Sequence, residues 1–233
     1  MKKRRYPGGK AGFGVYQTII NIMPPHETYI ETHLGEGAIL RKKRLAVQNY
    51  GIDIDPLLVQ KWINSTPEKT KIIQGDAVKF LDGFSFTGKE LVYCDPPYLK
   101  ETRKTGRIYR YEYTREQHID LLDCIVTLPC KVIISGYFSK LYSEKLSSWN
   151  VQTFQAQTSG GIPATEYLWF NFEKPLFLHD PQYIGKDYRE RERIKKKASR
   201  WVNRFESLPM LEKQAIMAQL EKSGVFEKNS FLL

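Results

Sequence analysis

The stretch LVYCDPPYLK, residues 91–100, runs from an apolar strand into two consecutive prolines and a tyrosine. One proline would be enough for a turn, because the residue before a proline is pushed out of the helical region. Two proline rings between Asp95 and Tyr98 also hold these side chains in a fixed relation. Open α/β sheets bind ligands where their strands end, so we predict a functional role for this tetrapeptide.

Short apolar segments alternate with helix-like segments on both sides of this stretch. Such alternation predicts an α/β fold with a doubly wound, mostly parallel sheet. The last two strands are joined by SGGIPA, residues 159–164, which is too short for a helical crossover, so we expect that pair to be antiparallel. The predicted strands cover residues 28–34, 49–55, 71–76, 90–95, 131–137, 151–158 and 166–172.

The composition fits one well-buried domain with a small appendage in 233 residues. Apolar residues make up 41% of the chain and aromatic residues 13%, which indicates a globular fold and not a disordered one. The net charge of +10 favours an anionic partner, such as nucleic acid or a membrane surface. No apolar run approaches the ~20 residues of a membrane span.

The basic start MKKRR is not followed by an apolar segment, so it does not predict a signal peptide. The three cysteines, Cys94, Cys124 and Cys130, have no paired spacing, and together with the histidines they form no metal-site pattern. These features predict a cytoplasmic protein without a metal.

The composition changes after Pro181. Residues 186–204 contain nine basic and three acidic side chains, and an apolar helical spacing follows from residue 210 to Gly224, a predicted helix stop. We therefore predict a domain over residues 1–180 and a basic helical extension over residues 185–233.

Three further sites are expected at the edge where Asp95 lies. Gly35 and Gly37 follow the first strand and would allow a ligand to approach the backbone closely, although a structural turn explains them equally. They do not form the Gly-x-Gly-x-x-Gly pattern of a phosphate loop. At the end of the second strand we assign Asp53 to a ribose and Asp55 to a helix cap. Asp76 follows the third strand, where a helix cap is the plainer interpretation.

In this order the motifs resemble those of the amino-group DNA methyltransferases, specifically the Dam-like N6-adenine methylases of bacteria and phages. The resemblance covers roughly residues 6–175. It depends on YPGGK (6–10), ETHLGEGAIL (31–40), GIDID (51–55), GDAVKFL (75–81), DPPY (95–98), SGY (135–137) and EYLWFNF (166–172).

The resemblance implies a Rossmann-like methyltransferase sheet and S-adenosylmethionine as the cofactor. It implies that Asp95 and the Pro96 carbonyl accept hydrogen bonds from the target amine, while Tyr98 stacks on the extruded base. The cofactor residues would be Tyr6, Lys10, Gly35, Gly37, Asp53, Asp76 and Asp95. By this resemblance, Lys10 would lie near the carboxylate of the cofactor, and Asp53 would bind the ribose of the cofactor.

This chain departs from the family pattern in two places. His33 stands where an aromatic side chain is usual beside the cofactor, and an imidazole can fill the same volume. The large target-recognition insertion of many family members is also absent between the motifs. The loop after DPPY, residues 99–118, interleaves basic and aromatic side chains and is predicted to face DNA. The residues predicted to contact the DNA are Tyr98, Arg103, Lys104, Arg107, Tyr109, Arg110 and Tyr111.

The sequence therefore predicts N6-adenine methylation of double-stranded DNA with a flipped target base and no membrane contact, by a monomer or weak dimer. Asp95 favours adenine over N4-cytosine, where serine is more frequent. RNA methylation and a nucleic-acid-binding module with a vestigial site stay as alternatives. A C5-cytosine methylase would need a nucleophilic cysteine, and Cys130 precedes a strand instead of following one.

Overall fold

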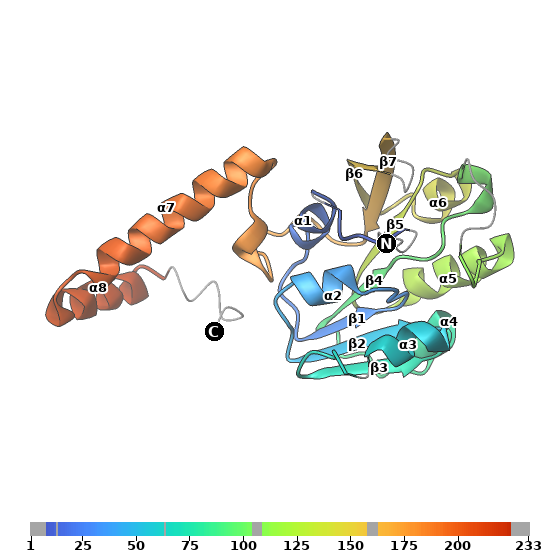
Figure 1. Cartoon of the computed structure of the whole chain (residues 1–233), viewed down its shortest axis with the longest axis horizontal. Coiled ribbons are helices and arrows are strands. Elements are labelled where there is room, and N and C mark those ends of the chain that lie inside the picture. The colour runs from blue at the N-terminus through green and yellow to red at the C-terminus, as the bar shows by residue number, and fades with distance from the viewer. Residues whose placement is uncertain (1–7, 13, 63, 104–108, 158–162, 225–233) are drawn as a thin grey trace, which may run out of the picture.

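The structure is a computed structural model, and it describes residues 8–12, 14–62, 64–103, 109–157 and 163–224 (Figure 1). The strands are β1 (Thr28–Glu31), β2 (Gln48–Asp53), β3 (Thr70–Gln74), β4 (Glu90–Cys94), β5 (Lys131–Gly136), β6 (Asn150–Gln157) and β7 (Pro163–Phe170). The helices are α1 (Val15–Ile20), α2 (Ala38–Lys42), α3 (Pro56–Trp62), α4 (Ala77–Asp82), α5 (Arg115–Thr127), α6 (Lys140–Lys145), α7 (Tyr188–Glu206) and α8 (Met210–Lys222). The short 3-10 turns are η1 (Lys100–Thr102) and η2 (Pro181–Tyr183).

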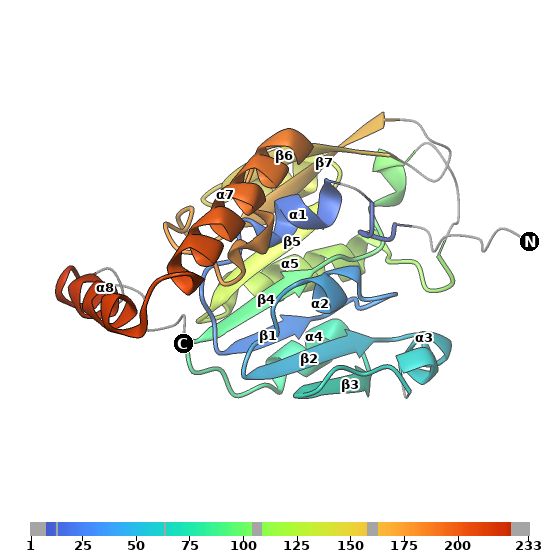
Figure 2. The same cartoon turned by 60° about the vertical axis from the view of Figure 1, so that its left-hand side comes forward.

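One seven-stranded sheet runs through the domain in the order β3-β2-β1-β4-β5-β7-β6 (Figure 2). β1 to β5 are parallel, whereas β7 runs antiparallel to both β5 and β6. This confirms the prediction of a doubly wound, mostly parallel Rossmann-like sheet with an antiparallel strand near its end. β4 lies beside β1, so Asp95 and the glycines after β1 leave the sheet side by side.

Local sequence signals fix where the helices begin. Asp76 caps α4, with its carboxylate accepting from the Lys79 backbone N–H. Thr114 caps α5 in a capping box with Gln117, and Ser139 caps α6. α4 follows β3 after two residues, whereas twenty residues, 95–114, separate β4 from α5.

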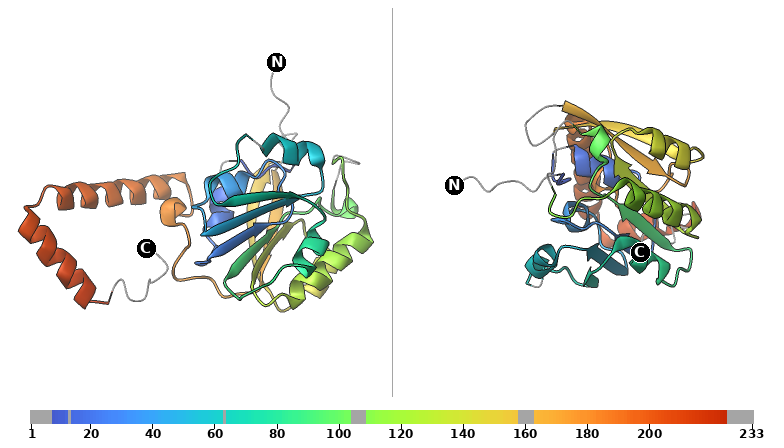
Figure 3. Two further views of the ribbon diagram at one scale, coloured as in Figure 1. Left: turned by 90° about the horizontal axis from the view of Figure 1, so that it is seen from below. Right: turned by 90° about the vertical axis from the view of Figure 1, so that its right-hand side faces the viewer.

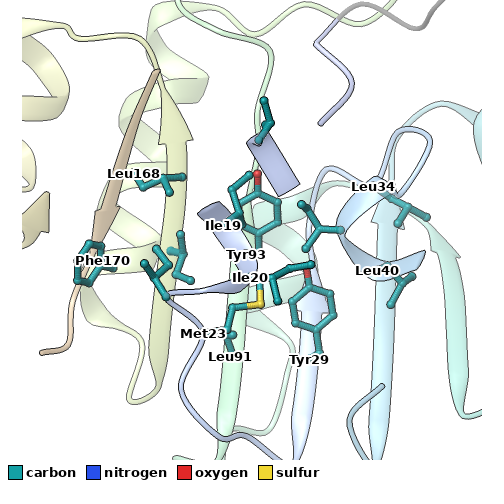
Figure 4. Packing of buried hydrophobic residues seen from close by; sticks show 14 of the residues in the cluster. Ile19, Ile20, Met23, Tyr29, Leu34, Leu40, Leu91, Tyr93, Leu168 and Phe170 are labelled. Carbon is teal, nitrogen blue, oxygen red and sulfur yellow. The ribbon is translucent and has the colours of Figure 1, made fainter. Parts of the chain in front are cut away.

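Two apolar layers cover the two faces of the sheet. On one face α1 and α2 pack against side chains such as Tyr93 and Phe170, as the close view shows (Figure 4). On the other face α4, α5 and α6 pack against Ile134 and Trp169. The face of Figure 4 also receives Leu168, so alternate residues of β7 supply both layers.

The chain after β7 first returns to the amino ends of β1 and β2 and then leaves the domain. There Asp180 accepts a hydrogen bond from the Arg44 backbone N–H at 2.7 Å, and His179 stacks on His26. α7 and α8 follow and contain no buried residue. α8 ends before Gly224, whose φ of 66° confirms the predicted stop. Within the described ranges, no helix is both long and apolar enough to span a membrane.

Candidate active site

A cleft opens at the carboxyl ends of β1, β2, β3 and β4, with an empty volume of about 1040 Å³ counted out to the solvent. Its walls come from residues 8–11, 31–38, 53–55, 75–77 and 109–111, together with Asp95, Pro97 and Tyr113.

Most residues that the sequence assigns to the cofactor line this one cleft: Lys10, Gly35, Gly37, Asp53, Asp76 and Asp95. Tyr109, Arg110 and Tyr111 of the predicted DNA-facing loop line it as well. Tyr6, Lys104 and Arg107 lie outside the described residues. The roles given to all these side chains stay predictions, but most of those described share one cavity.

Asp95 follows β4 directly and is held from two sides. Ser135, on the neighbouring strand β5, donates a hydrogen bond to its Oδ1 at 2.6 Å. Lys10 reaches the same oxygen with Nζ at 3.0 Å. The carboxylate is thus oriented by partners from two separate segments before any ligand enters.

Lys10 is the centre of a buried polar cluster, which consists of Lys10, Asp95, Tyr98 and Glu166. Its Nζ lies 3.1 Å from Glu166 Oε2 and donates to the Tyr98 hydroxyl. Tyr98 in turn donates to Glu166 at 2.7 Å. One cation therefore bridges two carboxylates, and only 4% of Lys10 is exposed.

The charges of this cluster depend on one another. Burial opposes the charge of Lys10, but Asp95 and Glu166 raise its pKa well above the usual value, so the ammonium stays charged. For Asp95 burial is the largest influence and raises the pKa, while Lys10 and the hydrogen bond from Ser135 act in the opposite direction. Lys10 thus favours the ionised carboxylate in a site that would otherwise favour the acid.

Asp53 and Asp55 at the end of β2 accept hydrogen bonds from different backbone N–H groups. Asp53 accepts from the Gly35 N–H at 2.7 Å and from the Asp55 N–H at 2.9 Å, one bond to each oxygen. Asp55 caps α3 by accepting from the Leu57 N–H, as predicted, and Arg110 pairs with it at 3.2 Å. Asp53 therefore ties the glycine loop after β1 to the end of β2.

Gly37 has a structural requirement that the sequence did not reveal. Its φ is 61°, and an added Cβ would lie 2.2 Å from the ring of Trp62. That ring also donates to the Gly35 carbonyl at 3.3 Å. The close neighbour of Gly37 in this structure is thus a tryptophan of α3, in line with the structural-turn alternative for this glycine.

We expect Gly37→Ala to destabilise the fold by about 1–3 kcal/mol, because the side chain meets both a left-handed backbone and a buried ring. The loss should appear as a lower denaturation midpoint in urea. Gly75→Ala is the matched control, since its Cβ would meet nothing within 4 Å. Equal midpoints for the two variants would contradict this packing account.

Asp76 fits the plainer interpretation as a helix cap, because its Oδ1 accepts from the Lys79 N–H at 3.0 Å. It also lines the cleft, so the cap leaves its second oxygen as a candidate for a ligand. Its role toward the cofactor stays a prediction.

His33 occupies the cleft wall as a neutral ring. Its Nδ1 is paired with Thr32 at 2.9 Å and its Nε2 with the Tyr113 hydroxyl at 2.8 Å. Burial lowers its pKa to about 3. The imidazole therefore lines the cleft without adding a positive charge to it.

The loop after DPPY differs in part from the expected cationic surface. Arg103 is paired with Glu112 through its two terminal guanidinium nitrogens, and only 3% of its side chain is exposed. This pairing makes Arg103 part of the loop's own structure, and its predicted contact with DNA stays a prediction. Arg110 is 55% exposed and stays a candidate.

The DPPY side chains are placed unevenly. Pro96 is buried, whereas Pro97 lines the cleft. Tyr98 is 6% exposed, and its ring meets Tyr137 edge-on at 4.7 Å. The stacking role of Tyr98 stays a prediction, and in this structure its hydroxyl completes the polar cluster around Lys10.

Sequence reasoning missed Glu166, Ser135 and Glu31 as site residues. Glu31 ends β1 in the cleft wall, and burial raises its pKa to about 8. A signal for Glu166 was present, because it shares the inward side of β7 with Leu168 and Phe170 at a spacing of two. A charged residue in that position needs a buried partner, and Lys10 supplies it.

No protein-family model and no curated protein matches this sequence. Solved structures with a similar fold include the 23S rRNA methyltransferase ErmE, 13% identical over 82% of this chain and 76% of that chain, with a TM-score of 0.48. An rRNA methylase from Streptococcus thermophilus is 12% identical over 67% of this chain and 93% of its own, with a TM-score of 0.42.

A precorrin 8w decarboxylase from Methanobacterium thermoautotrophicum is 11% identical over 71% of this chain and 92% of its own, with a TM-score of 0.46. At such identities the likeness concerns the fold alone. The chemistry must therefore follow from the cleft residues.

Proposed function

We propose that this protein is a methyltransferase that uses S-adenosylmethionine and methylates the exocyclic N6 amine of adenine in DNA. One observation carries the proposal: Asp95 of the DPPY motif lines the same cleft as the glycine loop and Asp53. A hydrogen-bond acceptor for an amine thus borders the cleft in which the cofactor would lie.

The residues of the cleft fit this cofactor. Each oxygen of Asp53 accepts one backbone N–H and has a second lone pair for a ribose hydroxyl. Burial raises the pKa of Asp53, so hydroxyl donors would stabilise its ionised form. His33 is neutral and does not repel a cation, while Gly35 and Gly37 present backbone to the cleft. The bound cofactor would supply an electrophilic methyl group on a positively charged sulfur.

Asp95 would prepare the target amine. The lone pair of an exocyclic amine is delocalised into its ring, and an acceptor on its hydrogen favours the pyramidal form that can attack. Lys10 and Ser135 fix the Asp95 carboxylate, and both lower its pKa against the larger effect of burial, which raises it. Asp95 would also take up the proton that the amine must lose once it is methylated. Positioning supplies most of the rate, and no covalent enzyme intermediate is needed.

Methylation of defined nucleic acids tests the proposal. The protein is incubated with S-adenosylmethionine carrying a labelled methyl group and with DNA or RNA, and the product is digested to nucleosides. We expect label in N6-methyladenine from DNA. Label in N4-methylcytosine, or in RNA alone, would reject the stated substrate, and no label in any nucleoside would reject the activity.

The ribose role of Asp53 is tested by Asp53→Asn. We expect roughly tenfold to hundredfold weaker cofactor binding, because the loss of a buried charged acceptor costs about 1–3 kcal/mol. Calorimetry measures the dissociation constant, and the exposed Asp120→Asn on α5 is the control for loss of charge. An unchanged constant would leave Asp53 as a purely structural acid between Gly35 and Asp55.

A further inference from the structure

The helix α7 stands apart from the sheet domain. It spans Tyr188–Glu206 without a buried residue, and Figures 1 and 3 show it extending sideways from the domain with α8 at its far end. At 1.5 Å per residue its 19 residues span about 28 Å. Most of its side chains are therefore exposed to solvent or to a partner.

Two stripes of side chains run along α7. The basic stripe consists of Arg189, Arg193, Lys196, Arg200 and Arg204. Their spacing of four, three, four and four residues keeps them on one side of the helix. The apolar stripe consists of Ile194, Ala198, Trp201 and Phe205 and lies on another side. The acidic residues of the helix, Glu190, Glu192 and Glu206, lie off the basic stripe.

The charge of the basic stripe is mostly uncompensated. Arg193 pairs with Glu190 at 3.2 Å, whereas Lys196, Arg200 and Arg204 are exposed. Over the part of the chain that the structure describes, no carboxylate forms an ion pair with these three. They follow one another at intervals of four residues, where like charges destabilise a helix. An external row of negative charges would relieve that repulsion.

We propose that the basic stripe of α7 binds the phosphate backbone of duplex DNA outside the cleft. From Arg189 to Arg204 the stripe spans about 22 Å, which equals the rise of about six base pairs along the axis of duplex DNA. The linker before α7 is fixed to the domain at Tyr183. Its ring packs edge-on against Tyr16, with the ring centroids 5.2 Å apart, and its hydroxyl donates to the Lys42 backbone carbonyl. The helix therefore starts from a defined place beside the domain. This inference rests on the proposed function in taking DNA as the substrate.

The test compares two full-length triple variants in binding a 40-base-pair duplex, with affinity measured over a range of salt concentrations. The stripe variant is Lys196→Gln, Arg200→Gln and Arg204→Gln. The control variant, Lys61→Gln, Lys71→Gln and Lys79→Gln, removes the same charge from exposed positions of the sheet domain. We expect the slope of log affinity against log salt to become shallower by about 2–3 in the stripe variant only, because each lost phosphate contact contributes about 0.9.

Two outcomes would overturn the proposal. Equal slopes for both variants would make the stripe a solvated face. A change in oligomeric state on sedimentation, without a change in slope, would mean that α7 serves contact between copies of the chain. Calorimetric titration of the wild type and the stripe variant with S-adenosylmethionine distinguishes a failure of the stripe proposal from a failure of the proposed function. Wild-type protein that binds no cofactor would fail the cleft assignment, whatever the slopes show.

Discussion

Replacing Asp95 with asparagine is expected to lower the rate of methyl transfer by about 10²–10³ while cofactor affinity changes only a few-fold. The asparagine keeps the shape but loses the charged acceptor, and one positioned electrostatic contact is worth about this much in the transition state. Cofactor affinity should change little, because the ribose contact falls to Asp53. Single-turnover transfer of a labelled methyl group measures the rate, and calorimetry measures cofactor affinity.

A suitable control for this variant is Glu144→Gln, which removes an acid from the surface pair with Lys140. Such exposed pairs contribute little, so its transfer rate should equal that of the wild type. Wild-type transfer by Asp95→Asn would show that the DPPY acid does not prepare the amine. A large loss of cofactor affinity would instead make Asp95 chiefly a cofactor residue.

The sheet could be predicted because its signals are local. Each parallel strand is a short apolar run, and the six-residue stretch SGGIPA restricted the last pair to an antiparallel hairpin. The convergence of Gly35, Asp53, Asp76 and Asp95 also followed, because the carboxyl ends of parallel strands share one edge. β1 and β2 end earlier than predicted because their last predicted residues leave the sheet to line the cleft, whereas β7 begins three residues earlier than predicted, at Pro163.

The polar cluster around Lys10 could not be predicted in the same way. Lys10 and Glu166 are far apart in the chain, and only the antiparallel return of β7 beside β5 brings them together. Arg103 shows the opposite limit, because a basic residue in a basic loop looks exposed until its pairing with Glu112 is known. Tertiary packing decides which distant segments come into contact. It also decides whether a basic side chain pairs with an acid or is exposed to solvent.

Lys10 and Glu166 are the two charged neighbours of Asp95. Neutralising one or the other should shift the pH dependence of methyl transfer in opposite directions. Activity requires ionised Asp95, so it should fall as the pH drops through the pKa of that carboxyl. Lys10 lowers this pKa and Glu166 raises it. Lys10→Met should therefore move the acid limb of the rate profile to higher pH by about one to three units, and activity lost at neutral pH should return in part under alkaline conditions.

Glu166→Gln should move the same limb to lower pH, because it removes a negative charge beside Asp95 and keeps an acceptor for the Tyr98 hydroxyl. This second variant keeps the test decisive if Lys10→Met folds poorly once two buried carboxylates lose their shared cation. Single-turnover rates from pH 5 to pH 9 give both profiles. A merely structural role for Lys10 and Glu166 would lower the rate at every pH and leave the midpoint in place, and that result would reject the electrostatic control of Asp95.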